Sequence, residues 1–333
     1  MLDDAMLEVT MKVLTEEQRQ QFQRDGCLVV ENVLDRSTVI EPVLAEYNGV
    51  LDEIAERMRA EGSISSTYPE LPFTERLVKI CCESGQNFPK YFDISLPLSG
   101  IKRDSPIHLG PAVFGLMTAP RLLDAVEDLI GPEIFSNPVQ HLRTKLPPRA
   151  IAKGFESHGQ VASVGWHQDN GVVLEEADEG TILTVWLPLN DASVENGCLQ
   201  VIPGSHRSEI IDHCPTSNGM RIPDALLPPR PPVPLPMQAG SALFMDQRTV
   251  HASLDNVTRD EVRMSFDLRY QPIGQPTGRP AFPGFVARSA ASPSSELHDA
   301  TGWARLWLDA RERLAAAEEA RFTRWNGDSP VCA

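Results

Sequence analysis

The sequence predicts a mainly β protein, a sandwich or barrel with helices around it, and three observations support this prediction. Short β-prone runs separated by Gly, Pro and Asn-Gly turns fill the second half of the chain, as is typical of sandwiches and barrels. The first third contains amphipathic helical patterns instead. The length of 333 residues and the 41% content of hydrophobic residues allow a sizeable core, so we expect an ordered globular protein.

The chain begins with a predicted helix and strand. A capping box formed by Thr15 and Gln18 predicts a helix over residues 16–24, and Gly26 ends it. The β-prone run at residues 27–30 then predicts a short strand.

Two further helices are predicted in the same part of the chain. One begins at Ser37, and the other covers residues 120–130 and ends at Gly131. Between them, several prolines interrupt residues 62–110, which we interpret as an irregular lid or binding loop. The helix from Ser37 is predicted from apolar residues spaced three or four apart: Val43, Leu44, Tyr47, Leu51, Ile54 and Met58.

The later elements are predicted from β-prone runs and one helical pattern. The segment 228–236 has six prolines, so it cannot be a central strand and is interpreted as a stiff surface connection. The predicted strands are residues 139–145, 165–168, 181–187, 198–202, 242–245 and 263–270. One helical face predicts a closing helix packed on the barrel, and its residues are Trp303, Leu306, Trp307, Ala310 and Leu314.

Charge excludes some partners. The chain has 30 Lys and Arg against 46 Asp and Glu, a net charge of −16, which repels nucleic acid and anionic membranes. The N-terminus lacks the pattern of a signal peptide, and no apolar run is long enough to span a membrane. We therefore expect a cytoplasmic protein that binds neither nucleic acid nor membranes, and its oligomeric state stays open.

The cysteines show no CxxC pair, so they match neither a disulfide scaffold nor a zinc ribbon. We interpret them as reduced thiols that mostly fill the core. They are Cys27, Cys81, Cys82, Cys198, Cys214 and Cys332.

A His-x-Asp pattern at His167 and Asp169 is the first sign of chemistry. On a strand, residues two apart project from the same face, so both side chains could reach one metal ion. His251 follows later, just beyond a predicted strand. Two histidines and one carboxylate form the facial triad associated with non-haem Fe(II) oxygen chemistry.

A polar row follows this triad on the last predicted strand. Arg263 and Ser265 share one face, while Met264, Phe266 and Leu268 share the other and would pack under helices. A fixed guanidinium and a hydroxyl near the metal suit the distal carboxylate of a small keto acid.

The sequence resembles the phytanoyl-CoA dioxygenase-like family of Fe(II)- and 2-oxoglutarate-dependent oxygenases. Its motifs occur in family order: residues 14–18 and 24–26, Lys145-Leu146-Pro147, His167-Gln168-Asp169, Asn196-Gly197-Cys198-Leu199, Pro203-Gly204-Ser205-His206 and the stretch from His251 to Arg263. The resemblance implies a double-stranded β-helix, a cupin-like jelly-roll barrel. Within a single catalytic domain over residues 1–333, we expect a helical part at 1–135, the barrel at 136–272 and a C-terminal extension with a helix at 273–333.

The resemblance also implies roles for individual residues. His167, Asp169 and His251 would bind Fe(II), while Arg263 and Ser265 would bind the C5 carboxylate of 2-oxoglutarate. Further candidates near this cosubstrate are Lys145 and Trp186, although Trp186 also fits a plain core position. With O₂ as the other cosubstrate, the implied reaction releases succinate and CO₂ and hydroxylates, desaturates or cyclises a substrate.

One spacing departs from the family pattern. Many relatives place the arginine eleven residues after the second histidine, whereas Arg263 lies twelve residues after His251. If the intervening turn does not absorb the extra residue, Arg259 or Arg269 becomes the rival anchor.

Two other classes of function stay open at this point. A His₂-carboxylate site also suits a zinc hydrolase, but the helix-borne pattern of many zinc hydrolases is missing and the Arg-Ser row would have no use. The other alternative is a non-catalytic barrel that binds a metal or small molecule. Related halogenases carry Ala or Gly at the position of Asp169, so its carboxylate argues against halogenation. We expect a small organic metabolite as substrate.

Overall fold

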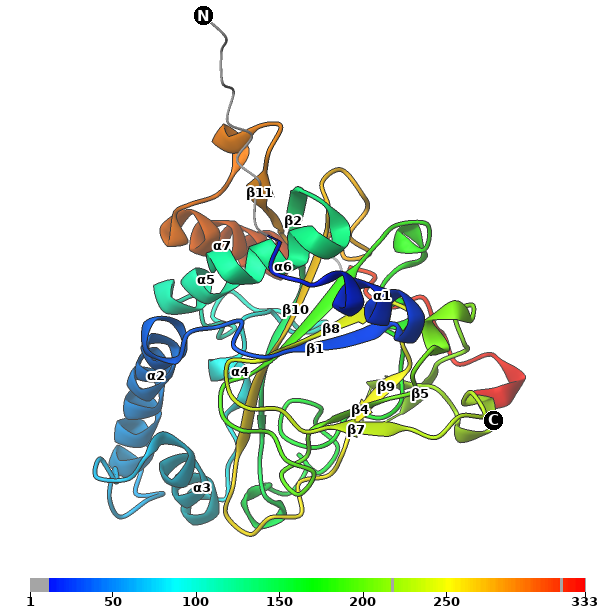
Figure 1. Cartoon of the computed structure of the whole chain (residues 1–333). Helices are drawn as coiled ribbons and strands as arrows, with labels where there is room; N and C mark the ends of the chain where they lie inside the picture. The colour runs from blue at the N-terminus through cyan, green and yellow to red at the C-terminus, as the bar shows by residue number, and fades with distance from the viewer. Residues whose placement is uncertain (1–11, 217–218, 318–319, 333) are drawn as a thin grey trace, which may run out of the picture.

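The computed structural model describes residues 12–216, 219–317 and 320–332. The first eight residues, on which the expected absence of a signal peptide depends, lie outside this part. Two antiparallel sheets form the barrel, with most helices on one side of the larger sheet (Figure 1). The predicted double-stranded β-helix, mainly β with flanking helices, is confirmed.

The larger sheet has six strands in the order β1-β8-β3-β10-β2-β11. Along β10, Met264, Phe266 and Leu268 are buried in the main core, whereas Arg263 and Ser265 face the interior of the barrel. The predicted alternation is therefore confirmed. The strands are β1 (Cys27–Val30), β2 (Glu133–Lys145), β3 (Leu183–Pro188), β8 (Ala242–Asp246), β10 (Arg263–Pro272) and β11 (Phe285–Ser289).

The smaller sheet forms the other wall of the barrel, in the order β7-β4-β9. Its strands are β4 (Leu199–Val201), β7 (Val233–Leu235) and β9 (His251–Ser253). The strand β7 lies in the proline-rich segment and pairs only with β4, because prolines are tolerated at a sheet edge. A separate hairpin consists of β5 (Cys214–Thr216) and β6 (Gly219–Arg221).

Helices cover the outer face of the larger sheet. The capping box of Thr15 and Gln18 begins α1, and Gly26 ends it with a φ of 73°. The side chain of Tyr47 on α2 packs against Phe266 of β10, with the ring centroids 6.3 Å apart. The helices are α1 (Glu16–Asp25), α2 (Glu41–Ala60), α5 (Pro111–Met117), α6 (Pro120–Ile130) and α7 (Ala300–Ala316).

The closing helix α7 is confirmed, with two differences from the prediction. Trp303 and Trp307 are buried, but Leu306 is 38% exposed and does not share their face. Trp303 packs against Phe114 of α5, and Trp307 packs against Phe282. The helix therefore contacts another helix and a loop as well as the core of the barrel.

Two secondary-structure predictions are wrong. Residues 62–110 contain the helices α3 (Phe73–Ser84) and α4 (Pro89–Phe92), because Pro72 and Pro89 stand at helix starts, where proline is well tolerated. Residues 165–168 do not form a strand. Only His167 pairs with His251 there, and a 3-10 turn (Asp169–Val172) follows.

The expectation that all cysteines are reduced is wrong for two of them. Cys214 at the start of β5 forms a disulfide with Cys332, across a sequence separation of 118 residues. The C-terminal segment folds back onto the barrel, and nothing in the spacing of the cysteines indicates that return. Cys27, Cys81 and Cys198 are buried free thiols, as predicted.

Among the described residues, none of the helices is both long and apolar enough to cross a membrane.

Candidate metal centre

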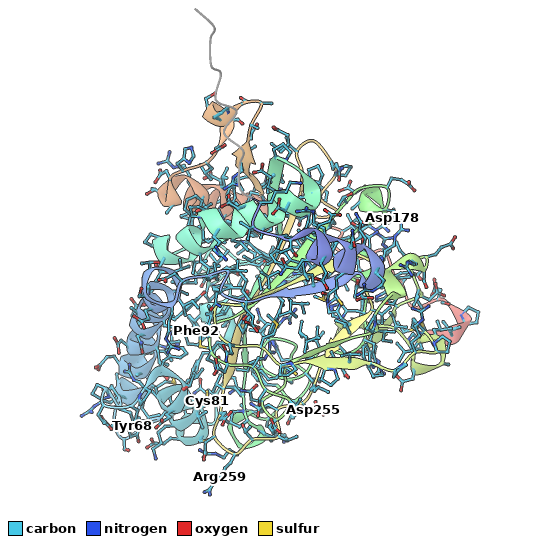
Figure 2. The ribbon with its side chains drawn as sticks, in the orientation of Figure 1. Tyr68, Cys81, Phe92, Asp178, Asp255 and Arg259 are labelled. Carbon is cyan, nitrogen blue, oxygen red and sulfur yellow. A yellow bond between two sulfur atoms is a disulfide. The ribbon has the colours of Figure 1, made fainter. Side chains whose placement is uncertain are left out.

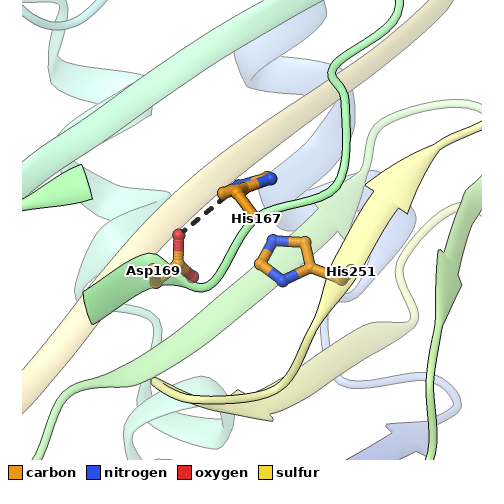
Figure 3. Close-up of side chains that lie close together, drawn as sticks. All are labelled: His167, Asp169 and His251. Atoms are coloured by element: carbon orange, nitrogen blue, oxygen red, sulfur yellow. Dashed lines mark ion pairs between the residues drawn. The ribbon is translucent and has the colours of Figure 1, made fainter. Parts of the chain in front are cut away.

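His167, Asp169 and His251 meet in the interior of the barrel (Figure 3). All three are buried, and each offers one ligand atom within 4.8 Å of the others. His251 begins β9, and two backbone hydrogen bonds of 3.0 Å join it to His167. The turn after Gln168 then brings the carboxylate of Asp169 to the imidazoles, with 3.8 Å between Nε2 of His167 and Oδ1 of Asp169.

Backbone carbonyls set the tautomers of both imidazoles. Nδ1 of His167 lies 2.9 Å from the carbonyl oxygen of Gly165, and Nδ1 of His251 lies 2.9 Å from that of Thr249. Because a carbonyl can only accept, each Nδ1 carries the proton and donates it. The lone pair of each Nε2 is thereby left for a metal ion, an arrangement common in metal sites.

The carboxylate of Asp169 is fixed by two further side chains. Nη2 of Arg269 donates to Oδ1 at 2.6 Å, and the hydroxyl of Thr184 donates to Oδ2. Burial would raise the pKa of Asp169, but the charge of Arg269 and the neighbouring imidazoles hold this pKa well below its usual value. Asp169 is therefore ionised and oriented as a metal ligand requires.

The environment also keeps His167 neutral. Burial and the proximity of His251 lower the pKa of His167 to about 3. Two imidazoles and one carboxylate match the donor set of the facial triad, so these residues fit a divalent iron ion.

An inner compartment of about 20 Å³ lies beside the triad, and its walls include His167, His251 and Arg263. Arg263 is only 1% exposed and forms no ion pair with the described residues, and its Nη1 donates to Ser265 at 2.8 Å. Its guanidinium lies 5.2 Å from the ring centre of the fully buried Trp186. Burial is the main cause that lowers the pKa of Arg263, to about 10. A charged group in this environment is suited to an anion entering the compartment.

Lys145 lies behind the wall of this compartment. Its Nζ donates to the hydroxyl of Ser253 and to the carbonyl of Leu254, both at 2.6 Å. Ser253 lines the compartment, whereas Lys145 does not. Burial and the nearby charge of Arg263 lower the pKa of Lys145.

Arg259 and Arg269, the rival candidates for binding the C5 carboxylate, are placed differently from Arg263. The side chain of Arg259 is 88% exposed, at the edge of the molecule in Figure 2. Arg269 forms an ion pair with Asp169. Of the three arginines, only Arg263 is both buried in the inner compartment and without a carboxylate partner.

A larger outer cavity of about 580 Å³ shares His167, Arg143 and Arg269 with the inner compartment. Further walls come from separate parts of the chain, among them the β5–β6 hairpin, the loop containing Arg279, and residues 320–323. A cavity of this size can enclose a small organic molecule next to the metal centre.

Sequence reasoning missed three contributors to the site. Arg269 was considered only as a rival anchor for the C5 carboxylate of 2-oxoglutarate. Thr184 and Arg279 were not identified at all. The inward alternation of β3 could have indicated Thr184, but the loop position of Arg279 gives no periodic signal.

The fold is similar to that of solved non-haem oxygenases. The apo structure of the non-heme monooxygenase ThoJ has a TM-score of 0.55 and 20% identity, covering 89% of this chain and 96% of that one. The nickel complex of ThoJ has a TM-score of 0.53 and 19% identity, covering 89% and 97%.

Relatives with similar sequences carry related names. A phytanoyl-CoA dioxygenase domain-containing protein 1 of Danio rerio is 27% identical over 267 residues, which are 74% of this chain and 87% of that protein. An ectoine dioxygenase of Bordetella parapertussis is 26% identical over 268 residues, or 74% and 71% of the two chains. The phytanoyl-CoA dioxygenase (PhyH) family model matches residues 22–265, well over half of the sequence. The chain therefore belongs to the phytanoyl-CoA dioxygenase family and is an Fe(II)- and 2-oxoglutarate-dependent oxygenase.

Proposed function

We propose that this enzyme hydroxylates, desaturates or cyclises a small organic metabolite. In this proposal His167, Asp169 and His251 hold the iron, and Arg263 with Ser265 binds the C5 carboxylate of 2-oxoglutarate. The observation that carries the proposal is the continuity of the buried triad with a compartment ending at an unpaired guanidinium.

The residues of the chain orient the reactants. His167, Asp169 and His251 would hold the iron through two imidazoles and one carboxylate, a donor set that would leave the metal accessible to the cosubstrates. Bound iron with 2-oxoglutarate supplies the oxidising chemistry, in which one O₂ converts 2-oxoglutarate to succinate and CO₂ and oxidises a substrate C–H bond. Arg263 fixes the far end of the cosubstrate, and Arg269 keeps the ligand oxygen of Asp169 in place.

The buried walls exclude water from this chemistry. Val164 and Leu199 line the inner compartment beside the triad, so a bound keto acid would be surrounded by apolar side chains as well as by Arg263. Exclusion of water strengthens the charge interactions there and limits side reactions. The substrate would occupy the outer cavity, next to His167.

The ligand set favours oxidation over the alternatives. Asp169 occupies the position that halogenases leave empty for chloride. A zinc hydrolase would need no second anion site, so the buried Arg263 would have no role in it.

Turnover assays test the proposal. The purified enzyme should consume O₂ and release succinate from 2-oxoglutarate only with Fe(II) present, and a true substrate should raise the rate. Succinate and oxidised substrate should form in a ratio near one to one. Hydrolysis of esters or amides by the zinc-loaded protein, with no succinate from the iron-loaded protein, would contradict the proposal.

A further inference from the structure

Arginine is the charged residue that lines the outer cavity, although the whole chain has a net charge of −16. Four arginines line it, together with two histidines, and no Asp or Glu among the described residues does so. The arginines are Arg143, Arg269, Arg279 and Arg321.

Three of these arginines already have a carboxylate partner. Arg143 pairs with Asp267, Arg269 pairs with Asp169, and Arg321 pairs with Glu175. In the described part of the chain, Arg279 forms no ion pair. Burial and the repulsive charge of the Arg269 guanidinium both lower the pKa of Arg279.

Arg279 is nevertheless buried, with 3% of its surface exposed. Its Nη2 donates to the carbonyl oxygen of Val172 at 2.8 Å, and its guanidinium lies 5.6 Å from the ring centre of Phe322. Its Nε is buried and has no hydrogen-bond partner within the described ranges of the chain. Such a charge is costly to bury, so its retention beside a cavity indicates that an anion completes the site.

Arg263 shows the same combination in the inner compartment. Both arginines are at least nine-tenths buried, and among the described residues both lack an ion pair and have an Nε without a hydrogen-bond partner. His167 lines both spaces. His167 of the metal centre thus borders two spaces that each contain a buried arginine, and the cosubstrate needs only one of these arginines.

We propose that Arg279 binds an oxyanion of the substrate, a carboxylate or a phosphate ester, and thereby selects small organic anions. This inference rests on the proposed oxygenase function and specifies its substrate class. Apolar walls from Val139, Val172, Met220 and Phe322 would contact the rest of the molecule. A guanidinium matches either oxyanion with two parallel hydrogen bonds, which a neutral amide cannot provide.

Binding of matched probes tests the proposal without requiring turnover. The protein is saturated with Fe(II) and 2-oxoglutarate under argon, so that the site at Arg263 is filled. Calorimetry then measures the binding of phenylacetate, its neutral analogue phenylacetamide, and phenyl phosphate. We expect the better anion to bind at least about tenfold more tightly than the amide. The phenylacetate and phenyl phosphate titrations decide which oxyanion the site prefers.

Substitutions test whether Arg279 causes the preference for the anion over the amide. Arg279→Gln should remove the difference between anion and amide, and Arg279→Lys should restore part of it, since lysine keeps the charge but not the planar fork. Arg321→Gln is the matched control, because Arg321 lines the same cavity but is exposed and paired with Glu175. Residues 318 and 319, both glutamates, lie outside the described part of the chain. A variant with glutamine at both positions should keep the wild-type preference.

The results separate failure of the inference from failure of the proposed function. Equal binding of anion and amide, no binding of either anion at millimolar concentration, or an unchanged preference in Arg279→Gln would overturn the inference. A gain in anion affinity after substitution of both glutamates would also overturn it, because the chain itself would then supply the anion. The charge-transfer band of iron with 2-oxoglutarate, recorded on the same samples, tests the proposed function independently.

Discussion

The inner compartment and the outer cavity are built in different ways. Barrel strands and the segment carrying His167 and Asp169 form the inner compartment, which lies almost entirely within residues 22–265 of the family match. The outer cavity adds the β5–β6 hairpin, the Arg279 loop and residues 320–323, and the last two lie beyond that match. In our proposal, the chemistry therefore depends on the barrel strands and the turn at Asp169, whereas substrate recognition depends on connections that can vary.

The C-terminal segment links the two spaces physically. The indole of Trp325 donates to the carbonyl oxygen of Gly171 at 2.5 Å, within the turn that begins at Asp169. Arg324 pairs with Asp178, which Figure 2 labels near the edge of the molecule, and Cys332 is bonded to Cys214. The segment thus covers the outer cavity and supports the metal-binding turn.

The largest effect should come from Asp169→Ala, which removes a metal ligand from the inner compartment. Even residues behind a ligand change affinity or activity by about 10–100-fold, so succinate formation should fall by more than about a hundredfold. Asp255→Ala, at an exposed carboxylate near His251, is the control and should keep wild-type turnover. Wild-type turnover in Asp169→Ala would refute the assignment of the triad.

Next, Arg263→Gln should raise the KM for 2-oxoglutarate by about 10–100-fold, because a charged hydrogen bond to the C5 carboxylate is lost. Steady-state kinetics with varied 2-oxoglutarate measures this effect. Arg259→Gln is the control, since its side chain is 88% exposed. A larger rise in KM for Arg259→Gln would show that the extra residue in the turn has moved the anchor.

Arg269→Gln should weaken the binding of Fe(II) rather than the binding of 2-oxoglutarate. Because Asp169 loses its guanidinium partner, Fe(II) affinity should fall by roughly 10–100-fold, as measured by competition with a chelator. At saturating Fe(II), the KM for 2-oxoglutarate should change less than in Arg263→Gln. The opposite pattern in the two variants would mean that their roles are exchanged.

Removal of the disulfide should have the smallest effect on the metal centre. A bridge that closes a loop of this length contributes at most about 5 kcal/mol to the free energy of unfolding. The double variant Cys214→Ser/Cys332→Ser should therefore show faster hydrogen exchange in residues 320–332. Cys82→Ser, at an exposed free thiol, is the control. Unchanged exchange in the double variant would show that the other contacts hold the segment alone.

Local signals predicted much of the barrel and the triad. The capping box of α1 and the alternation along β10 depend on neighbouring residues, and both are confirmed. The triad residues were identified correctly as neighbours, but for a partly wrong reason. His167 and Asp169 do not share a strand face, because a turn delivers the carboxylate.

Features that depend on distant contacts could not be predicted. The pairing of Arg269 with Asp169 requires the register of β10 against the metal-binding turn. The disulfide requires the return of the C-terminal segment, and the burial of Arg279 depends partly on Phe322 from that segment. None of these contacts leaves a pattern in the local sequence.

The most direct test of the central claim is an anaerobic titration of the metal-free protein with Fe(II) and 2-oxoglutarate. The account predicts a visible charge-transfer band that requires both components, is lost in His167→Ala and Asp169→Ala, and needs more 2-oxoglutarate in Arg263→Gln. Tight zinc binding with no band from Fe(II) and 2-oxoglutarate would contradict it.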